Sequence, residues 1–120
     1  MENTQKRNSY RIDRNLPIKF MKENRQDIED GETTNISETG LAFSHDYVLR
    51  RDDIVKITIE LEDKKITATG SVIANERLPE GSRYKFKYRI KFIQIQPNTQ
   101  DILAKYIWNE QLKANKNEQS

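Results

Sequence analysis

The chain contains no cysteine, which excludes disulfide bonds, thiolate metal sites and cysteine nucleophiles. It contains a single histidine, His45, so no histidine metal cluster or histidine-based catalytic pair is expected. A glycine-rich phosphate loop and an HExxH motif are also missing from the sequence. We therefore expect a protein that is not an enzyme, with no catalytic residues and no metal site.

Long apolar runs are absent as well. No stretch is long enough to span a bilayer, and the N-terminal sequence MENTQKRNSYRIDRN has no apolar signal core. Hydrophobic residues make up 34% of the 120 residues and charged residues 33%, which predicts one domain with a modest core and a very polar surface. We expect a cytoplasmic protein without membrane insertion.

Positive and negative charges nearly balance over the whole chain, but the small positive surplus is unevenly distributed along it. The formal net charge is only +2, which argues against bulk binding of nucleic acid. Residues 1–15 alone hold the same surplus, because four cations there face two acids. Residues 1–13 also lack apolar periodicity, so we predict a flexible basic arm at this end.

Residues 14–96 show the alternation of apolar and polar residues that is typical of strands. Turn sequences such as Asp30-Gly31 and LPEGS separate the strands, and no helical pattern intervenes. This pattern predicts a mainly β fold, a small antiparallel barrel, with a bulge or bend at Gly70 that helps the barrel to close. The residues expected in the core are Leu16, Ile18, Phe20, Val55, Ile57, Ile59, Leu61, Ile66, Ala68, Val72, Tyr84, Phe86, Tyr88, Ile90 and Phe92.

The periodicity changes after Pro97. Apolar residues then recur at helical spacing, which predicts an amphipathic helix over residues 97–113 with Asn98 as its cap. Residues 114–120 are expected to form a polar tail. The apolar residues of this helix are Ile102, Leu103, Tyr106, Ile107 and Leu112.

Two short motifs stand at a characteristic distance. Arg7 and Arg11 form R-x-x-x-R before the first strand, and Asn35, Ser37 and Gly40 form N-x-S-x-x-G within NISETG. Together with GSVI and YRIKFIQI further on, they make the chain resemble the PilZ domain family over about residues 6 to 112. The resemblance implies a six-stranded barrel with a terminal helix, and binding of cyclic di-GMP, a bacterial second messenger.

The resemblance also implies which residues bind that ligand. No cofactor is expected besides cyclic di-GMP. Members of the family often carry a glycine in the strand that reads YRIKF here. This chain lacks that glycine, and we interpret the position as structural. Lys6 stands where many members have another arginine. The ligand-binding residues are therefore expected to be Lys6, Arg7, Arg11, Asn35, Ser37 and Gly40.

The chemistry of these residue types fits a guanine dinucleotide. Arginine can bond guanine O6 and N7 with both arms of its fork, hold a phosphate, or stack on a purine. Asparagine and serine offer neutral donors and acceptors to a base edge, and glycine admits close approach of the backbone or a positive φ. The expected output is a changed surface for an unidentified downstream protein.

Other readings remain open. Arg7 and Arg11 could be a solvated basic tail, and the N-x-S-x-x-G residues could simply form a tight turn. A ligand-independent protein-interaction module of PilZ type is one alternative, although such a module would be expected to lack the arginines. A binder of single-stranded nucleic acid is another, but the small net charge and the core-like alternation of the aromatic residues argue against it.

Overall fold

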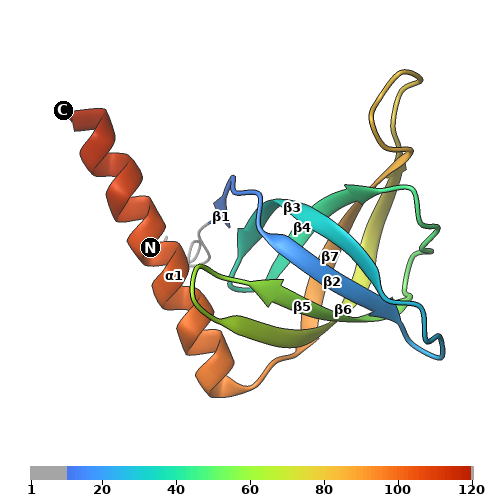
Figure 1. The fold of residues 1–120 in the computed structure, drawn as a ribbon, viewed down its shortest axis with the longest axis horizontal. Coiled ribbons are helices and arrows are strands. Elements are labelled where there is room, and N and C mark those ends of the chain that lie inside the picture. Colours follow the sequence, from blue (N-terminus) through green and yellow to red (C-terminus); the bar gives the residue numbers. More distant parts are fainter. Residues whose placement is uncertain (1–10, 120) are drawn as a thin grey trace, which may run out of the picture.

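Residues 11–119 are described in this computed structural model of the chain, with their side chains up to residue 113. They form seven strands followed by one helix (Figure 1). The strands are β1 (Arg11–Ile12), β2 (Pro17–Lys22), β3 (Glu29–Ser37), β4 (Gly40–His45), β5 (Ile54–Glu60), β6 (Lys65–Arg77) and β7 (Phe86–Gln94), and the helix is α1 (Pro97–Gln119).

Six of the strands close into a barrel. The sheet order is β1-β3-β2-β5-β6-β7-β4, every pairing is antiparallel, and an additional pairing of β3 with β4 joins the two ends. Strand β1 is an extra short strand that pairs with the end of β3, at Ile36 and Ser37, on the side opposite β4. The predicted six-stranded antiparallel barrel with a C-terminal helix is therefore confirmed. Closure leaves the barrel strands without open edges.

The alternating residues fill the interior of the barrel. Phe43 packs there against both Phe20 and Tyr88, with ring centroids 4.9 Å apart for Phe20 and Phe43 and 5.5 Å apart for Phe43 and Tyr88. The Tyr88 hydroxyl is satisfied inside the core, because it donates to the Tyr47 carbonyl and accepts from the Leu49 amide. The predicted bulge is also present, as the β6–β7 register shifts between Thr69 and Gly70.

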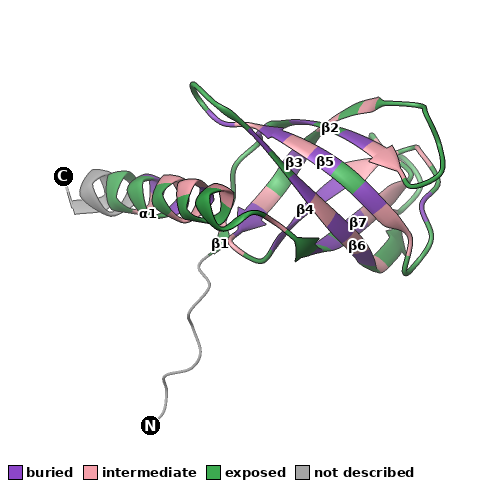
Figure 2. Ribbon diagram, turned by 90° about the horizontal axis from the view of Figure 1, so that it is seen from below, coloured by how far each residue is buried: buried purple, intermediate pink, exposed green. Residues whose placement is uncertain are grey.

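Helix α1 packs across one end of the barrel and touches β1 and β3 (Figure 1). Leu103 and Ile107 face the barrel and are buried, whereas Leu112, predicted on the same stripe, is 46% exposed. The helix begins at Pro97, so Asn98 lies inside its first turn rather than at the cap. Figure 2 shows buried, half-buried and exposed residues on the described turns of the helix.

Three predicted boundaries differ from the structure. The helix continues to Gln119, where a polar tail was expected, because the sequence after residue 113 contains no proline or glycine to end it. Arg11 and Ile12 belong to the predicted arm but form β1. Asp30-Gly31 was expected to turn, but it lies within β3 opposite Lys19 and Ile18, and the chain turns earlier, at Asn24 with φ 71°.

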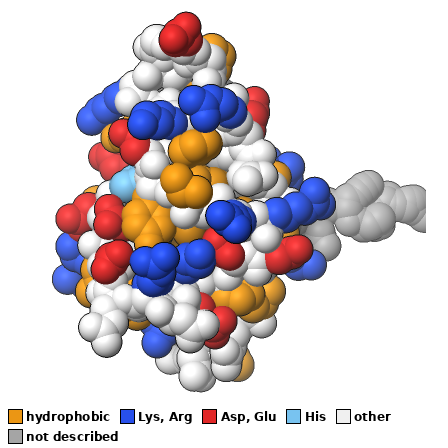
Figure 3. Space-filling view, turned by 90° about the vertical axis from the view of Figure 1, so that its right-hand side faces the viewer, with side chains coloured by type: hydrophobic (Ala, Val, Ile, Leu, Met, Phe, Trp, Pro, Cys, Tyr) orange, Lys and Arg blue, Asp and Glu red, His pale blue; other side chains and the backbone are white. Residues whose placement is uncertain are grey.

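The surface that faces away from α1 carries charges of both signs. Lysines and arginines alternate there with acids around exposed hydrophobic side chains (Figure 3). Such a mixture gives no extended positive field of the kind that holds a nucleic-acid backbone. No helix within residues 11–119 is long and apolar enough to cross a membrane.

Candidate ligand pocket on the outer face of β4

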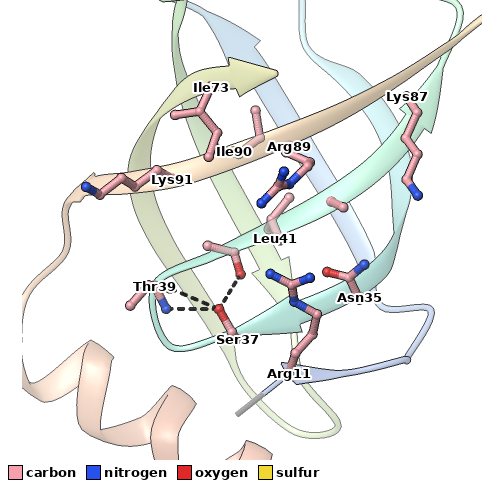
Figure 4. Close-up of a pocket in the computed structure, with 12 residues that line it drawn as sticks. Arg11, Asn35, Ser37, Thr39, Leu41, Ile73, Lys87, Arg89, Ile90 and Lys91 are labelled. Carbon is pink, nitrogen blue, oxygen red and sulfur yellow. Dashed lines mark hydrogen bonds between the residues drawn. The ribbon is translucent and has the colours of Figure 1, made fainter. Parts of the chain in front are cut away.

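A cavity of about 410 Å³ lies on the outside of the barrel, over β4. This volume is in the range of small-molecule sites. Arg11, Asn35, Ser37 and Gly40 all line it, so four of the six residues predicted to bind ligand come together (Figure 4). The others, Lys6 and Arg7, lie outside the described residues. The remaining lining residues are Thr39, Leu41, Ala42, Ile73, Lys87, Arg89, Ile90 and Lys91.

Sheet register explains why these residues meet. Arg11 of β1 stands opposite Ser37 of β3, and Gly40 of β4 stands opposite Lys91 of β7. Directly opposed residues in a sheet share a face, and residues two apart on a strand return to it. Because the intervening side chains, such as Ile36, Leu41 and Ile90, point into the core, this shared face is the outer one.

Gly40 allows β4 to approach β7 closely. A Cβ atom added there would lie 2.0 Å from the carbonyl oxygen of Ile90, a backbone atom that cannot turn aside. The Phe92 amide also donates to the Thr39 carbonyl at 2.8 Å, next to this point. Gly40 has no positive φ, so close approach of two strands, and not an unusual backbone angle, is the reason for glycine.

Ser37 holds the turn that joins β3 to β4. Its hydroxyl oxygen accepts from the Thr39 amide at 3.2 Å and lies 3.3 Å from the Gly40 carbonyl, to which it can donate. These are the bonds of a serine turn. The turn reading of the motif therefore holds for Ser37, and its side chain, in a residue only 6% exposed, helps to shape the pocket floor.

Arg11 and Asn35 present polar groups to the cavity. Neither side chain makes a hydrogen bond or ion pair with another residue in 11–119. Figure 4 shows the Arg11 guanidinium beside the Asn35 carboxamide at the edge of the pocket. Between them they offer a charged planar donor and a neutral group that can both donate and accept.

The pocket is strongly cationic. Arg11, Lys87, Arg89 and Lys91 line it, and none of the aspartates and glutamates between residues 11 and 113 does. Within the described part of the chain these four side chains form no ion pair. The three β7 cations were missed at the sequence level, although their alternation in YKFKYRIKF, opposite the core-facing residues, already places them on one outward face.

His45 lies apart from this pocket and has a structural role. Its Nδ1 accepts from the Tyr47 amide at 3.0 Å, so Nε2 carries the proton and donates to the Asp30 carbonyl at 2.8 Å. The ring also stacks on Tyr84, with the two planes 3° apart. Among residues 11–119, no cluster of three histidine, cysteine or carboxylate side chains is placed to hold a metal ion.

The comparisons with known proteins agree with this architecture. The PilZ domain family model matches residues 5–108. The chain belongs to the PilZ domain family. A search of curated protein sequences gives no match.

Several solved PilZ-type structures share the fold. Bacillus subtilis Inhibitor of motility (MotI/DgrA) superposes with a TM-score of 0.78 and 22% identity over 94% of this chain. The PilZ domain of Escherichia coli YcgR with c-di-GMP gives 0.70 and 11%, over 97% of this chain and 99% of that one. The K. pneumonia MrkH–c-di-GMP complex gives 0.79 and 16%, over 95% of this chain. This chain spans 55% of the MotI/DgrA chain and 56% of the MrkH chain.

Proposed function

We propose that the protein is a non-catalytic, cytoplasmic receptor for cyclic di-GMP, and that the cavity over β4 is its binding site. The observation that carries this proposal is the convergence of Arg11, Asn35, Ser37 and Gly40, from two motifs far apart in sequence, on one cavity that no described carboxylate lines. Two of the structurally similar PilZ proteins have c-di-GMP in their solved structures, which supports the same ligand class here.

The properties of the pocket match the properties of the ligand. Cyclic di-GMP carries two phosphates and two guanines, so it needs positive charge, planar donors and some apolar surface. Arg11 supplies a fork for a guanine edge or a phosphate. Asn35 supplies neutral hydrogen bonds, and Ile73, 38% exposed at the rim, supplies apolar contact. Gly40 keeps the floor of the pocket shallow.

Binding at this pocket has a direct route to the terminal helix. Arg11 lies in β1, which contacts α1, and Arg14 just after β1 pairs with the buried carboxylate of Glu110 on α1. A ligand that binds Arg11 therefore contacts the same short segment, β1 and Arg14, that also contacts the helix. We propose that an unidentified downstream protein reads the resulting change at the arm, at β1 and at α1.

Calorimetric titration with cyclic di-GMP and with cyclic di-AMP tests the proposal and gives the stoichiometry. Cyclic di-GMP should bind more tightly, because adenine presents an amino donor where guanine presents O6 to an arginine donor. Arg7→Ala and Arg11→Ala should each weaken binding by about 1–3 kcal/mol, the scale of one bidentate contact. Arg51→Ala removes an equal charge from an exposed turn outside the pocket and should change nothing.

Each outcome has a separate meaning. If the parent protein binds no cyclic di-GMP, the proposed function is wrong, and a ligand-independent interaction module becomes the better interpretation. If it binds the adenine analogue equally well, the site exists but does not read guanine. An arginine variant with the parent's affinity would remove that arginine from the binding site.

A further inference from the structure

The outer face of β7 forms a second wall of the pocket, which neither of the two sequence motifs includes. Lys87, Arg89 and Lys91 alternate along this strand and all line the cavity. Their core-facing neighbours Tyr88 and Ile90 are buried, so the three cations point outward together. Figure 4 places them across β4 from Arg11 and Asn35.

The register places Arg89 on the same rung as the motif asparagine. Asn35 stands opposite Ala42, and Ala42 stands opposite Arg89. Two strand spacings separate Asn35 from Arg89, which is roughly 10 Å between backbones. The residue between them is alanine, so the floor is low and nothing on that rung stands between the two walls.

Among the described residues, no acid or hydrogen-bond partner accounts for the side chain of Arg89. Across the β6–β7 pairing it stands opposite Ala74, and Lys91 stands opposite Ser71, both neutral and small. Neither Arg89 nor Lys91 forms an ion pair or a side-chain hydrogen bond with another residue in 11–119. Cations gathered in one cavity without acids repel one another, and an anion relieves that repulsion.

We propose that Arg89, assisted by Lys91, is a second anion-binding contact that holds the phosphate of the ligand farther from the arm. This inference rests on the proposed function and deepens it. Arg11 engages the ligand from β1, and Arg89 engages it from β7, so that a ligand with two phosphates is clamped between guanidinium groups. The two-walled arrangement selects a doubly charged cyclic dinucleotide over a ligand with one phosphate.

Titration of Arg89→Ala, Arg89→Lys and Lys91→Ala with cyclic di-GMP at several salt concentrations tests the inference, with Arg51→Ala as the matched control. Arg89→Ala should bind roughly 5- to 150-fold more weakly, the range of one bidentate contact. Its affinity should also fall less steeply with salt than that of the parent, because one screened contact between a cation and a phosphate is lost. Arg89→Lys should keep most of the parent's salt dependence while losing affinity, because it retains the charge without the fork.

Thermal melting without ligand separates binding from a structural role. Arg89 is exposed, so Arg89→Ala should melt at or above the temperature of the parent, since it removes repulsion between cations. Arg89→Ala with the parent's affinity and salt dependence would overturn the inference while leaving the proposed function intact. A parent protein that does not bind cyclic di-GMP would overturn both. If Arg89→Ala did not fold, unchanged binding by Arg89→Lys together with Lys91→Ala would overturn the inference equally.

Discussion

The guanidinium of Arg14 donates a hydrogen bond to the carboxylate of Glu110, and this pair joins the segment before β2 to helix α1. The Glu110 side chain is only 7% exposed, whereas that of Arg14 is 44% exposed. Lys113 donates to the second carboxylate oxygen at 3.2 Å, and this bond raises the pKa of the Lys113 ammonium group. One buried acid thus holds two cations at the junction of helix and barrel.

Arg14→Ala should lower the free energy of unfolding by about 1–2 kcal/mol, between the values for exposed and for buried pairs, because Glu110 would keep its burial but lose its main partner. Urea unfolding at neutral pH measures this. Lys19→Ala is the control, since Lys19 and Asp30 form a short but exposed pair at 2.6 Å. Equal losses from both variants would show that the Arg14–Glu110 pair does not anchor the helix.

Gly40 should tolerate no side chain, and Gly31 should tolerate a small one. In Gly40→Ala the new methyl group would collide with the Ile90 carbonyl, so we expect a loss of about 1–3 kcal/mol in unfolding free energy, the scale of overpacking. In Gly31→Ala the nearest atom would be 3.5 Å away, an ordinary contact. Denaturant unfolding of both variants decides the matter, and equal stability would show that β4 can move away from β7.

The barrel could be predicted from the sequence because alternation is a local signal. The alternation within one strand indicates which of its faces is buried, whichever strands lie beside it. Val55, Ile57 and Ile59 form one such run, and all three are fully buried. Turns were less certain, because Asp30-Gly31 has turn composition yet lies in β3, where Asp30 pairs with Lys19 across the strands. The end of the helix was missed because polar residues without a breaker neither require nor forbid a helix.

The candidate site could be predicted only as far as its motifs reach. Asn35, Ser37 and Gly40 lie close together in sequence, so a known pattern finds them. Arg89 is far from them in the chain and meets them only through the β3–β4 and β4–β7 registers, which depend on barrel closure. The role of Gly40 was also partly hidden, because contact with Ile90 is a property of the tertiary structure.

Tyr88→Phe should destabilise the barrel and change its response to alkali. The Leu49 amide and the Tyr47 carbonyl would lose their partner, at a cost of about 1–3 kcal/mol for the buried groups left unpaired. Burial raises the pKa of the Tyr88 hydroxyl, opposed in part by the Leu49 hydrogen bond. As pH rises above about 10, the unfolded chain therefore loses this proton before the folded chain does, and the stability that it contributes is lost as pH approaches the folded pKa.

Urea unfolding of the parent and of Tyr88→Phe, at neutral pH and near the ordinary tyrosine pKa of about 10, measures both effects. The variant should be less stable at neutral pH but should lose less further stability in alkali. Part of the loss should remain, because burial also raises the pKa of Tyr106. Tyr84→Phe keeps the ring stacked on His45 and should leave neutral stability unchanged. An identical alkaline loss in parent and Tyr88→Phe would contradict the assignment to Tyr88.

Cyclic di-GMP should increase hydrogen-exchange protection of the arm and of the β3–β4 turn while leaving the far side of the barrel unchanged. Strand β1 is only two residues long and pairs with β3 alone, so it should open locally at small cost before ligand binds. A ligand that engages Arg11 and the Ser37 turn closes this opening. Peptides covering residues 6–13 and 35–41 should therefore gain protection, and those of β5, which lies between β2 and β6, should not.

Full protection of residues 11–12 before ligand is added would mean that β1 is already locked. The signal would then have to leave through the Arg14–Glu110 contact and α1, and Arg14→Ala would sever it without weakening ligand binding.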